Sequence, residues 1–219
     1  MLPTTRSDFS QGHRFIGNVS YQHKWNDNIK TTLGLFYEGS QSSPITYIYD
    51  EGPDLLNDDS RDNAIIYVPA TQSEINLVDT SDYTAQEQWD ALDAFIESNE
   101  YLRSRRGQYA ERNGERGPWS HVIDLKFLQD FSMNFNDKKH TFQLSLDIFN
   151  FTNLLNKDWG QKRFVGSFGE VELIDTRVAA PDPAFSFDPD IIEQLERLDD
   201  AGIQSSRWQM QIGLRYIFN

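Results

Sequence analysis

Apolar and polar residues alternate with a period of two in five stretches of the chain. In the first of these stretches, Val19 and Tyr21 fall on one set of alternate positions, whereas Asn18 and Ser20 fall on the other. A period of two is typical of β-strands that have one apolar and one polar face. The pattern predicts an all-β fold with long strands at about residues 12–25, 29–41, 119–132, 139–151 and 206–219.

The connections between these strands alternate strictly between short and long. Residues 26–28 and 135–138 form short turns, whereas about residues 42–118 and 153–205 form long loops. Transmembrane β-barrels have short periplasmic turns and long extracellular loops. On that rule both long loops are expected outside the cell.

Aromatic residues stand at the ends of the predicted strands. Those at one set of ends are Trp25, Phe131, Phe135 and Phe218, and those at the opposite set are Trp119 and Trp208. A bilayer interface selects aromatic residues at both ends of an apolar band. A soluble antiparallel sandwich also has alternating strands, but its strands typically have about 5–6 residues. Strand length and aromatic placement therefore favour the wall of a transmembrane antiparallel β-barrel.

Five strands are too few for such a barrel, because bacterial barrels have an even number of strands, from about eight upward. The first residues, Met1 to Asp8, also lack the basic start and apolar stretch of a signal peptide. We therefore expect residues 1–219 to be the C-terminal portion of a larger barrel, with two long loops that contain short helices.

The first long loop is predicted to contain a helix from Thr84 to about Arg103. Thr84 and Glu87 have the spacing of a capping box, and an apolar stripe follows at helical spacing. This stripe could pack on its own loop or serve as a docking face. A shorter helix is predicted at Asp190–Leu198.

The formal net charge of −14 is confined to the two loops. Residues 50–118 hold 16 acidic and 6 basic residues, residues 177–205 hold 7 and 2, and the remainder holds 11 and 12. This acidity argues against nucleic-acid binding. The absence of cysteine excludes disulfides and thiolate metal sites, and the mean hydropathy of −0.62 excludes a transmembrane helix.

No pattern of an enzyme active site or cofactor site is present, and the four histidines lack metal-ligand spacing. Asp58, Asp59 and Asp62 are weak metal candidates, because the segment that holds them lacks the glycine and distal glutamate of an EF-hand loop. One basic stretch could neutralise neighbouring carboxylates or hold an anionic ligand. It consists of Arg103, Arg105, Arg106, Arg112 and Arg116.

Several segments, taken in order, resemble the late barrel strands of Bacteroidetes-type TonB-dependent outer-membrane receptors. They include Leu35-Phe36-Tyr37-Glu38-Gly39, Leu144-Ser145-Leu146-Asp147-Ile148-Phe149-Asn150, Asn153-Leu154-Leu155-Asn156-Lys157-Asp158-Trp159-Gly160 and Gly213-Leu214-Arg215-Tyr216-Ile217-Phe218. The resemblance implies a barrel of about 22 strands that is closed by a plug domain, which this sequence lacks. It also implies import of a nutrient across the outer membrane with energy from a TonB complex that acts through the plug.

The resemblance implies further partners and sites. The barrel would lie in outer-membrane lipid and meet the rest of the barrel, the plug, an unknown nutrient ligand and the barrel-assembly machinery. The terminal strand resembles the signal that this machinery reads, carried by Trp208, Met210, Ile212, Leu214, Tyr216 and Phe218. The ligand path would be lined by the polar residues Gln143, Asp147, Gln211 and Arg215. A fragment of a passive porin and a soluble sandwich that binds a ligand remain the alternatives.

Overall fold

The computed structural model describes residues 5–10, 12–50, 52–59, 63–165, 169–179, 181–198 and 206–218. The chain divides into two compact units. The sheet unit consists of His13–Gln41, Trp119–Arg163 and Leu198–Asn219, and the loop unit consists of Met1–Gly12, Ser42–Pro118 and Phe164–Arg197. The described residues are mostly β-strand, which confirms the predicted fold class at this level. No helix in the described ranges is long and apolar enough to cross a membrane.

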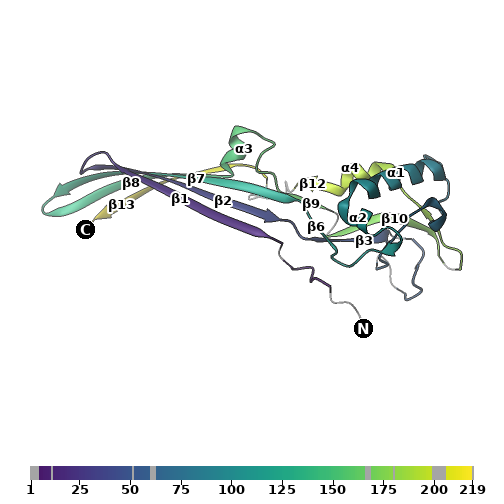
Figure 1. Cartoon of the computed structure of the whole chain (residues 1–219). Helices are drawn as coiled ribbons and strands as arrows, with labels where there is room; N and C mark the ends of the chain where they lie inside the picture. Colours follow the sequence, from purple (N-terminus) through teal and green to yellow (C-terminus); the bar gives the residue numbers. More distant parts are fainter. Residues whose placement is uncertain are drawn as a thin grey trace. The chain divides into compact units, whose positions relative to one another are not determined.

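The sheet unit contains one antiparallel sheet of five long strands in the order β1-β2-β7-β8-β13 (Figure 1). The strands are β1 (Arg14–Lys24), β2 (Ile29–Gln41), β7 (Trp119–Phe135), β8 (Lys138–Phe149) and β13 (Gln209–Phe218). They lie where the alternating pattern predicts strands, with ends shifted by a few residues. A short helix, α3 (Phe151–Leu155), follows β8.

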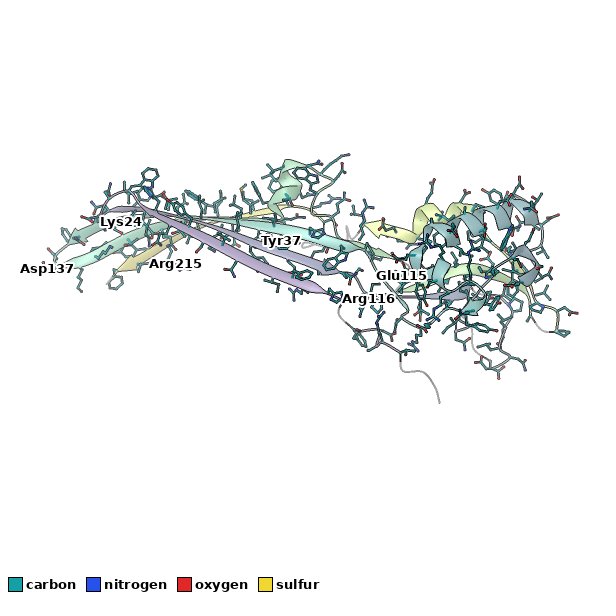
Figure 2. The ribbon with its side chains drawn as sticks, viewed as in Figure 1. Lys24, Tyr37, Glu115, Arg116, Asp137 and Arg215 are labelled. Carbon is teal, nitrogen blue, oxygen red and sulfur yellow. The ribbon has the colours of Figure 1, made fainter. Side chains whose placement is uncertain are left out.

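The two short turns of this sheet are determined by asparagine and aspartate. In the β1–β2 turn, the Asn26 side chain accepts hydrogen bonds from the backbone amides of Asn28 and Ile29 at 2.9 and 2.8 Å. In the β7–β8 turn, Asn136 and Asp137 both have positive φ, at 49° and 59°. Two successive left-handed residues form the hairpin turn whose twist matches that of the flanking strands. Lys24 and Asp137 lie near the turns, and Tyr37 lies far along β2 (Figure 2).

The loop unit is built from both long loops around a second sheet, in the order β11-β10-β3-β6. Its strands are β3 (Pro44–Asp50), β6 (Glu115–Arg116), β10 (Glu170–Val178) and β11 (Ala184–Ser186). Strand β3 comes from the first loop and β10 from the second, and they pair in parallel. The sequence pattern predicted no strands in the two long loops, so this pair is an addition to the predicted fold. Parallel pairing needs a long connection, and the stretch between these strands supplies one.

Two small pairs of strands complete the described β-structure. They are β4 (Tyr67–Val68) with β5 (Gln108–Tyr109), and β9 (Arg163–Val165) with β12 (Glu196–Leu198). The loops also contain two single turns of 3₁₀-helix, at Gln72–Glu74 and Pro189–Ile191.

The predicted capped helix is present as α1 (Ala85–Ser98), followed by α2 (Glu100–Ser104). The Thr84 amide donates to the Glu87 carboxylate at 2.8 Å, and the Glu87 amide donates to the Thr84 hydroxyl at 3.3 Å. The helix is interrupted at Asn99, whose side chain accepts a hydrogen bond from the Leu102 amide and so begins α2. Leu92 and Ile96 are buried in the core of the loop unit, so the apolar stripe packs on its own loops.

The prediction of a second helix at Asp190–Leu198 was wrong in its extent. Only the single turn α4 (Ile192–Leu195) is helical there, after the 3₁₀ turn at Pro189–Ile191. Residues Glu196–Leu198 instead form β12 and pair with β9. Backbone pairing with a distant strand thus overrides the local helical spacing, which cannot reveal such a partner.

The core of the loop unit draws all its buried apolar residues from the two long loops. Its largest fully buried side chains include Ile66, Leu92, Leu173, Ile174 and Phe187. Gln88 of α1 is also fully buried. Its amide group donates to the carbonyls of Val78 and Tyr83 and accepts from the Phe187 amide. A side chain of the first loop thereby satisfies a backbone group of the second.

Candidate functional site

The register of the five long strands sorts their side chains onto two chemically different faces. Leu33, Phe127 and Leu146 are neighbours across β2, β7 and β8, and this face continues to Ile212 on β13. The adjacent positions Thr32, Leu128 and Ser145 share the opposite face, on which most residues are polar. We call these the apolar face and the polar face. The register therefore aligns the apolar positions of neighbouring strands on one face and the mostly polar positions on the other.

Cross-strand ion pairs run along the polar face. Lys126 Nζ lies 2.8 Å from the carboxylate of Asp147, which is directly opposite on β8. Lys30 Nζ lies 2.8 Å from the carboxylate of Asp130, opposite on β7. The Gln143 side chain adds a hydrogen bond of 2.7 Å to Asp130. Opposite charges in facing positions stabilise a sheet and fix its register.

The structure brings the four predicted ligand-path residues together on this polar face. Gln211 of β13 faces Asp147 of β8, and Arg215 of β13 faces Gln143 of β8. Gln143 and Asp147 are engaged in the polar contacts described above, whereas Gln211 and Arg215 are exposed. The four residues therefore form one patch on two neighbouring strands.

Two adjoining hollows lie along the strands of the sheet unit. The Gly34 hollow has a volume of about 290 Å³ and is lined by Asn18, Val19, Ser20, Gly34, Leu35, Phe36, Asp124, Leu125, Lys126, Asp147, Ile148 and Phe149. The Lys162 hollow has a volume of about 300 Å³ and is lined by Phe36, Glu38, Ser40, Val122, Asp124, Phe149, Asn150, Lys162, Arg207 and Gln209. Phe36, Asp124 and Phe149 border both hollows. Together the hollows form a trough of the size that small ligands occupy.

Asn150 organises the end of this trough. It has a left-handed backbone with φ of 51°, and its amide donates to the Asp124 carboxylate at 2.8 Å. Its side-chain amide donates to the carbonyls of Gly160 at 2.9 Å and Ser206 at 3.3 Å. The Ser206 hydroxyl in turn accepts a hydrogen bond from the Lys162 amide at 2.8 Å. This network holds the segment that carries Lys162 beside the polar face.

Comparison with known proteins finds no matching protein family, no matching curated protein and no matching solved structure.

The residues predicted as an assembly signal share the apolar face where the structure describes them in a strand. Met210, Ile212, Leu214, Tyr216 and Phe218 occupy alternate positions of β13 and are exposed, and Trp208 directly precedes this strand. At the turn end of the sheet, the Tyr216 hydroxyl lies 2.5 Å from His140 Nδ1. At the other end, the Phe15 and Trp119 rings stack with centroids 5.8 Å apart. Aromatic side chains therefore lie at both ends of the apolar face.

The weak metal candidates do not form a site in the described residues. Asp58 accepts a hydrogen bond from the Asn63 side chain at 2.9 Å, and the Asp59 amide donates to Asp54 at 2.8 Å. Asp62 lies outside the described residues. Among the residues that are described, no group of three or more histidine, aspartate or glutamate side chains could hold a metal ion.

Four of the five arginines in the basic stretch neutralise carboxylates of the loop unit. Arg103 pairs with Glu97, Arg105 with Glu111, Arg106 with Asp93 and Glu97, and Arg112 with Asp8. Arg116 differs, because its guanidinium donates to the backbone carbonyl and hydroxyl of Ser10 at 2.7 and 3.0 Å. Partial burial lowers the pKa of Arg116. Of the two roles considered for the basic stretch, neutralisation of carboxylates is therefore observed for Arg103, Arg105, Arg106 and Arg112.

Sequence reasoning missed the residues that border both hollows. Phe36 and Phe149 interrupt the polar positions of their strands, and this interruption was the one available signal. That they flank Asp124 follows only from the cross-strand register. Lys162 reaches the hollow because the hydrogen bonds of Asn150 and Ser206 position its segment. The periodicity of the strands does not reveal this arrangement.

Proposed function

We propose that the sheet unit is part of the wall of an outer-membrane β-barrel, and that the chain belongs to a TonB-dependent receptor that imports a nutrient. The observation that carries this proposal is the exposed apolar face. Side chains on it are as exposed as Val19 at 70%, Ile212 at 69% and Leu214 at 76%. Soluble monomeric proteins rarely expose a continuous apolar patch of more than a few hundred Å². A lipid bilayer is the solvent in which such a face is stable.

The two faces have separate roles in this proposal. The apolar face contacts lipid, its aromatic ends lie at the two bilayer interfaces, and the polar face lines the lumen. In the described residues, β1 and β13 each pair with one neighbour in this sheet. Open strand edges are not tolerated in lipid, so the proposal requires further strands of the barrel beside both.

The topology supports an orientation for the wall. Both long connections leave the sheet at the end where β2 and β8 finish, and both short turns lie at the other end. Long loops are extracellular in outer-membrane barrels. In this proposal the long loops therefore lie outside the cell, on the side from which the nutrient arrives.

A soluble sandwich is less well supported than a barrel wall. A sandwich needs a second sheet that covers the apolar face of the first. The second sheet described here belongs to a core whose members all come from the loop unit.

Site-directed spin labelling tests the wall directly, because the chain has no cysteine and each introduced thiol is unique. The complete barrel that contains this chain, with any cysteine elsewhere in it replaced, would be reconstituted in phosphatidylcholine vesicles. It would carry one nitroxide at Leu144→Cys, Ser145→Cys, Gln211→Cys or Ile212→Cys. We expect labels at 144 and 212 to collide mainly with dissolved oxygen, which concentrates in lipid. Labels at 145 and 211 should collide mainly with a water-soluble nickel chelate.

Each adjacent pair is its own matched control, since the two labels differ only in the face that they occupy. Equal exposure of neighbouring labels to the nickel chelate would contradict the wall. So would a chain that stays monomeric in buffer without detergent.

The receptor part of the proposal is tested separately from the wall. A passive porin would share every strand feature described here. The complete barrel, inserted in a planar bilayer with potassium chloride on both sides, should show no stable open-channel conductance if a plug closes it. Regular conductance steps would instead identify a porin.

A further inference from the structure

Four charged side chains line the Lys162 hollow. Glu38 forms an ion pair with Arg14 at 2.8 Å, and Arg207 has an interaction of its own. The other two are Asp124 and Lys162. Within the part of the chain that the structure describes, neither Asp124 nor Lys162 forms an ion pair with any residue. Lys162 also has a Coulombic interaction with Glu38, but Glu38 is paired more closely with Arg14. Asp124 and Lys162 are therefore the anion and the cation of this hollow that no salt bridge occupies in the described residues.

Hydrogen bonds hold the Asp124 carboxylate and the backbone of Lys162 in place. One carboxylate oxygen of Asp124 accepts a hydrogen bond from the Asn150 amide. The backbone of Lys162 is tied to the Ser206 hydroxyl by two hydrogen bonds, of 2.8 and 3.1 Å. The Lys162 ammonium group takes no part in these bonds. The Asp124 carboxylate is thus preorganised, which favours ligand binding because less ordering is required.

The hollow also offers apolar surface. Phe36 and Phe149 are 37% and 45% exposed, although they belong to the face on which polar residues predominate. Small-molecule sites combine apolar lining with a few well-placed polar groups, and a volume of about 300 Å³ is at the lower end of their range. The hollow therefore suits a small ligand with opposite charges and an apolar side chain.

We infer that the Lys162 hollow binds an amino acid or short peptide as a zwitterion. The ligand ammonium donates to Asp124, the ligand carboxylate accepts from Lys162, and an apolar side chain packs on Phe36 and Phe149. Charge-assisted hydrogen bonds of this type are about twice as strong as neutral ones. The hydroxyls of a neutral sugar would hydrogen-bond to both groups but would neutralise neither charge. The inference rests on the proposed function, because a nutrient reaches this hollow only if the polar face lines a lumen.

Calorimetric titration of the full chain in detergent micelles with the dipeptide phenylalanyl-alanine tests this inference. Two derivatives remove one charge each, namely the N-acetyl dipeptide and the dipeptide amide. We expect each derivative to bind at least about tenfold more weakly than the parent, as expected for loss of one charged hydrogen bond.

Variants assign each ligand charge to its protein partner. Asp124→Asn keeps an oxygen that can accept from the Asn150 amide, so the local fold should persist. This substitution should weaken binding of the parent dipeptide by about tenfold. It should not change binding of the N-acetyl derivative, because that derivative has already lost the charge that Asp124 would contact. Lys162→Gln should likewise weaken binding of the parent dipeptide and leave binding of the dipeptide amide unchanged. Lys157→Gln is the matched control, because this exposed lysine does not line the hollow.

The outcomes separate this inference from the proposed wall. If neighbouring spin labels show the two faces but the dipeptide does not bind at millimolar concentration, the ligand assignment is overturned and the wall stands. Equal binding of the parent and both derivatives would also overturn it, as would maltose that binds where the dipeptide does not. If the labels show no alternation, the wall itself fails, and any dipeptide binding then belongs to a soluble module.

Discussion

Asp175 is the carboxyl group of the loop unit that is placed least favourably for its charge. It lies opposite Asp50 in the parallel pairing of β10 with β3, and both residues are half-buried. Burial raises the pKa of Asp175, and the neighbouring Asp50 raises it further, against the opposing effect of Arg177. The Arg177 guanidinium lies 2.9 Å from the Asp175 carboxylate, so it offsets the repulsion in part.

Because the folded state raises this pKa, it binds a proton more tightly than the unfolded chain does. The loop unit therefore loses stability as the pH rises from the ordinary aspartate value of about 3.8 towards the raised folded value. We expect Asp175→Asn to remove this loss and to raise the urea midpoint at pH 7 above that of the parent chain. A fluorophore on Ala94→Cys, at an exposed position of α1, would report the unfolding.

Asp182→Asn is the control, since Asp182 is an exposed residue outside β10 and β11. This control should leave the pH dependence of the midpoint unchanged. The role of Asp175 would be contradicted if the Asp175→Asn variant had the same urea midpoint as the parent chain at every pH between about 4 and 7.

At the scale of elements, the β7–β8 turn shows how two residues determine a hairpin. Asn136 and Asp137 both adopt the left-handed conformation, which costs a residue other than glycine about 1 kcal/mol, and less for asparagine and aspartate. We expect Asp137→Gly to stabilise the sheet by about 0.5–1 kcal/mol, whereas Asp137→Val should destabilise it by more than that. Equilibrium urea unfolding in vesicles would measure both changes.

The first turn supplies the comparison for this prediction. Asp27 is absent from the positive-φ residues described in the structure, and it pairs with Lys24 at 2.7 Å. Asp27→Gly should therefore give no gain in stability. An equal gain from glycine at both positions would show that conformational strain at Asp137 is not the cause.

The alternation of apolar and polar residues with a period of two was sufficient to predict the strands of the sheet, because this alternation is a local property of the sequence. Leu33 and Thr32 differ in polarity, and the structure places them on opposite faces. The capped helix at Thr84 was predictable for the same reason. The pairing of β3 with β10 was not, since its partners come from different loops. The Lys162 hollow combines cross-strand register with one turn, so no single stretch of sequence contains it.

At the scale of the whole molecule, the two long loops form one folding unit and are not independent excursions from the sheet. Strands β3 and β10 pair over five positions between Thr46 and Asp50. The Phe185 amide donates to the Asn76 carbonyl, and the Phe185 carbonyl accepts from the Val78 amide, each at 2.9 Å. Ile174 of the second loop is fully buried in the same core as Leu92 of the first. Opening one loop would therefore expose core residues of the other.

This shared core predicts that a substitution in one loop unfolds the other. Ile174→Asp places a charge in the core and should cost several kcal/mol, enough to unfold a small unit. We expect the amides of α1, which belongs to the first loop, to lose protection from hydrogen exchange in this variant. The amides of β7 and β8 should keep theirs, because the sheet unit has its own backbone pairing. Val178→Asp is the matched control, since Val178 is 51% exposed at the end of the same strand. If α1 kept its protection in Ile174→Asp, the loops would be separate folding units, and the extracellular part of the proposed receptor could open one loop at a time.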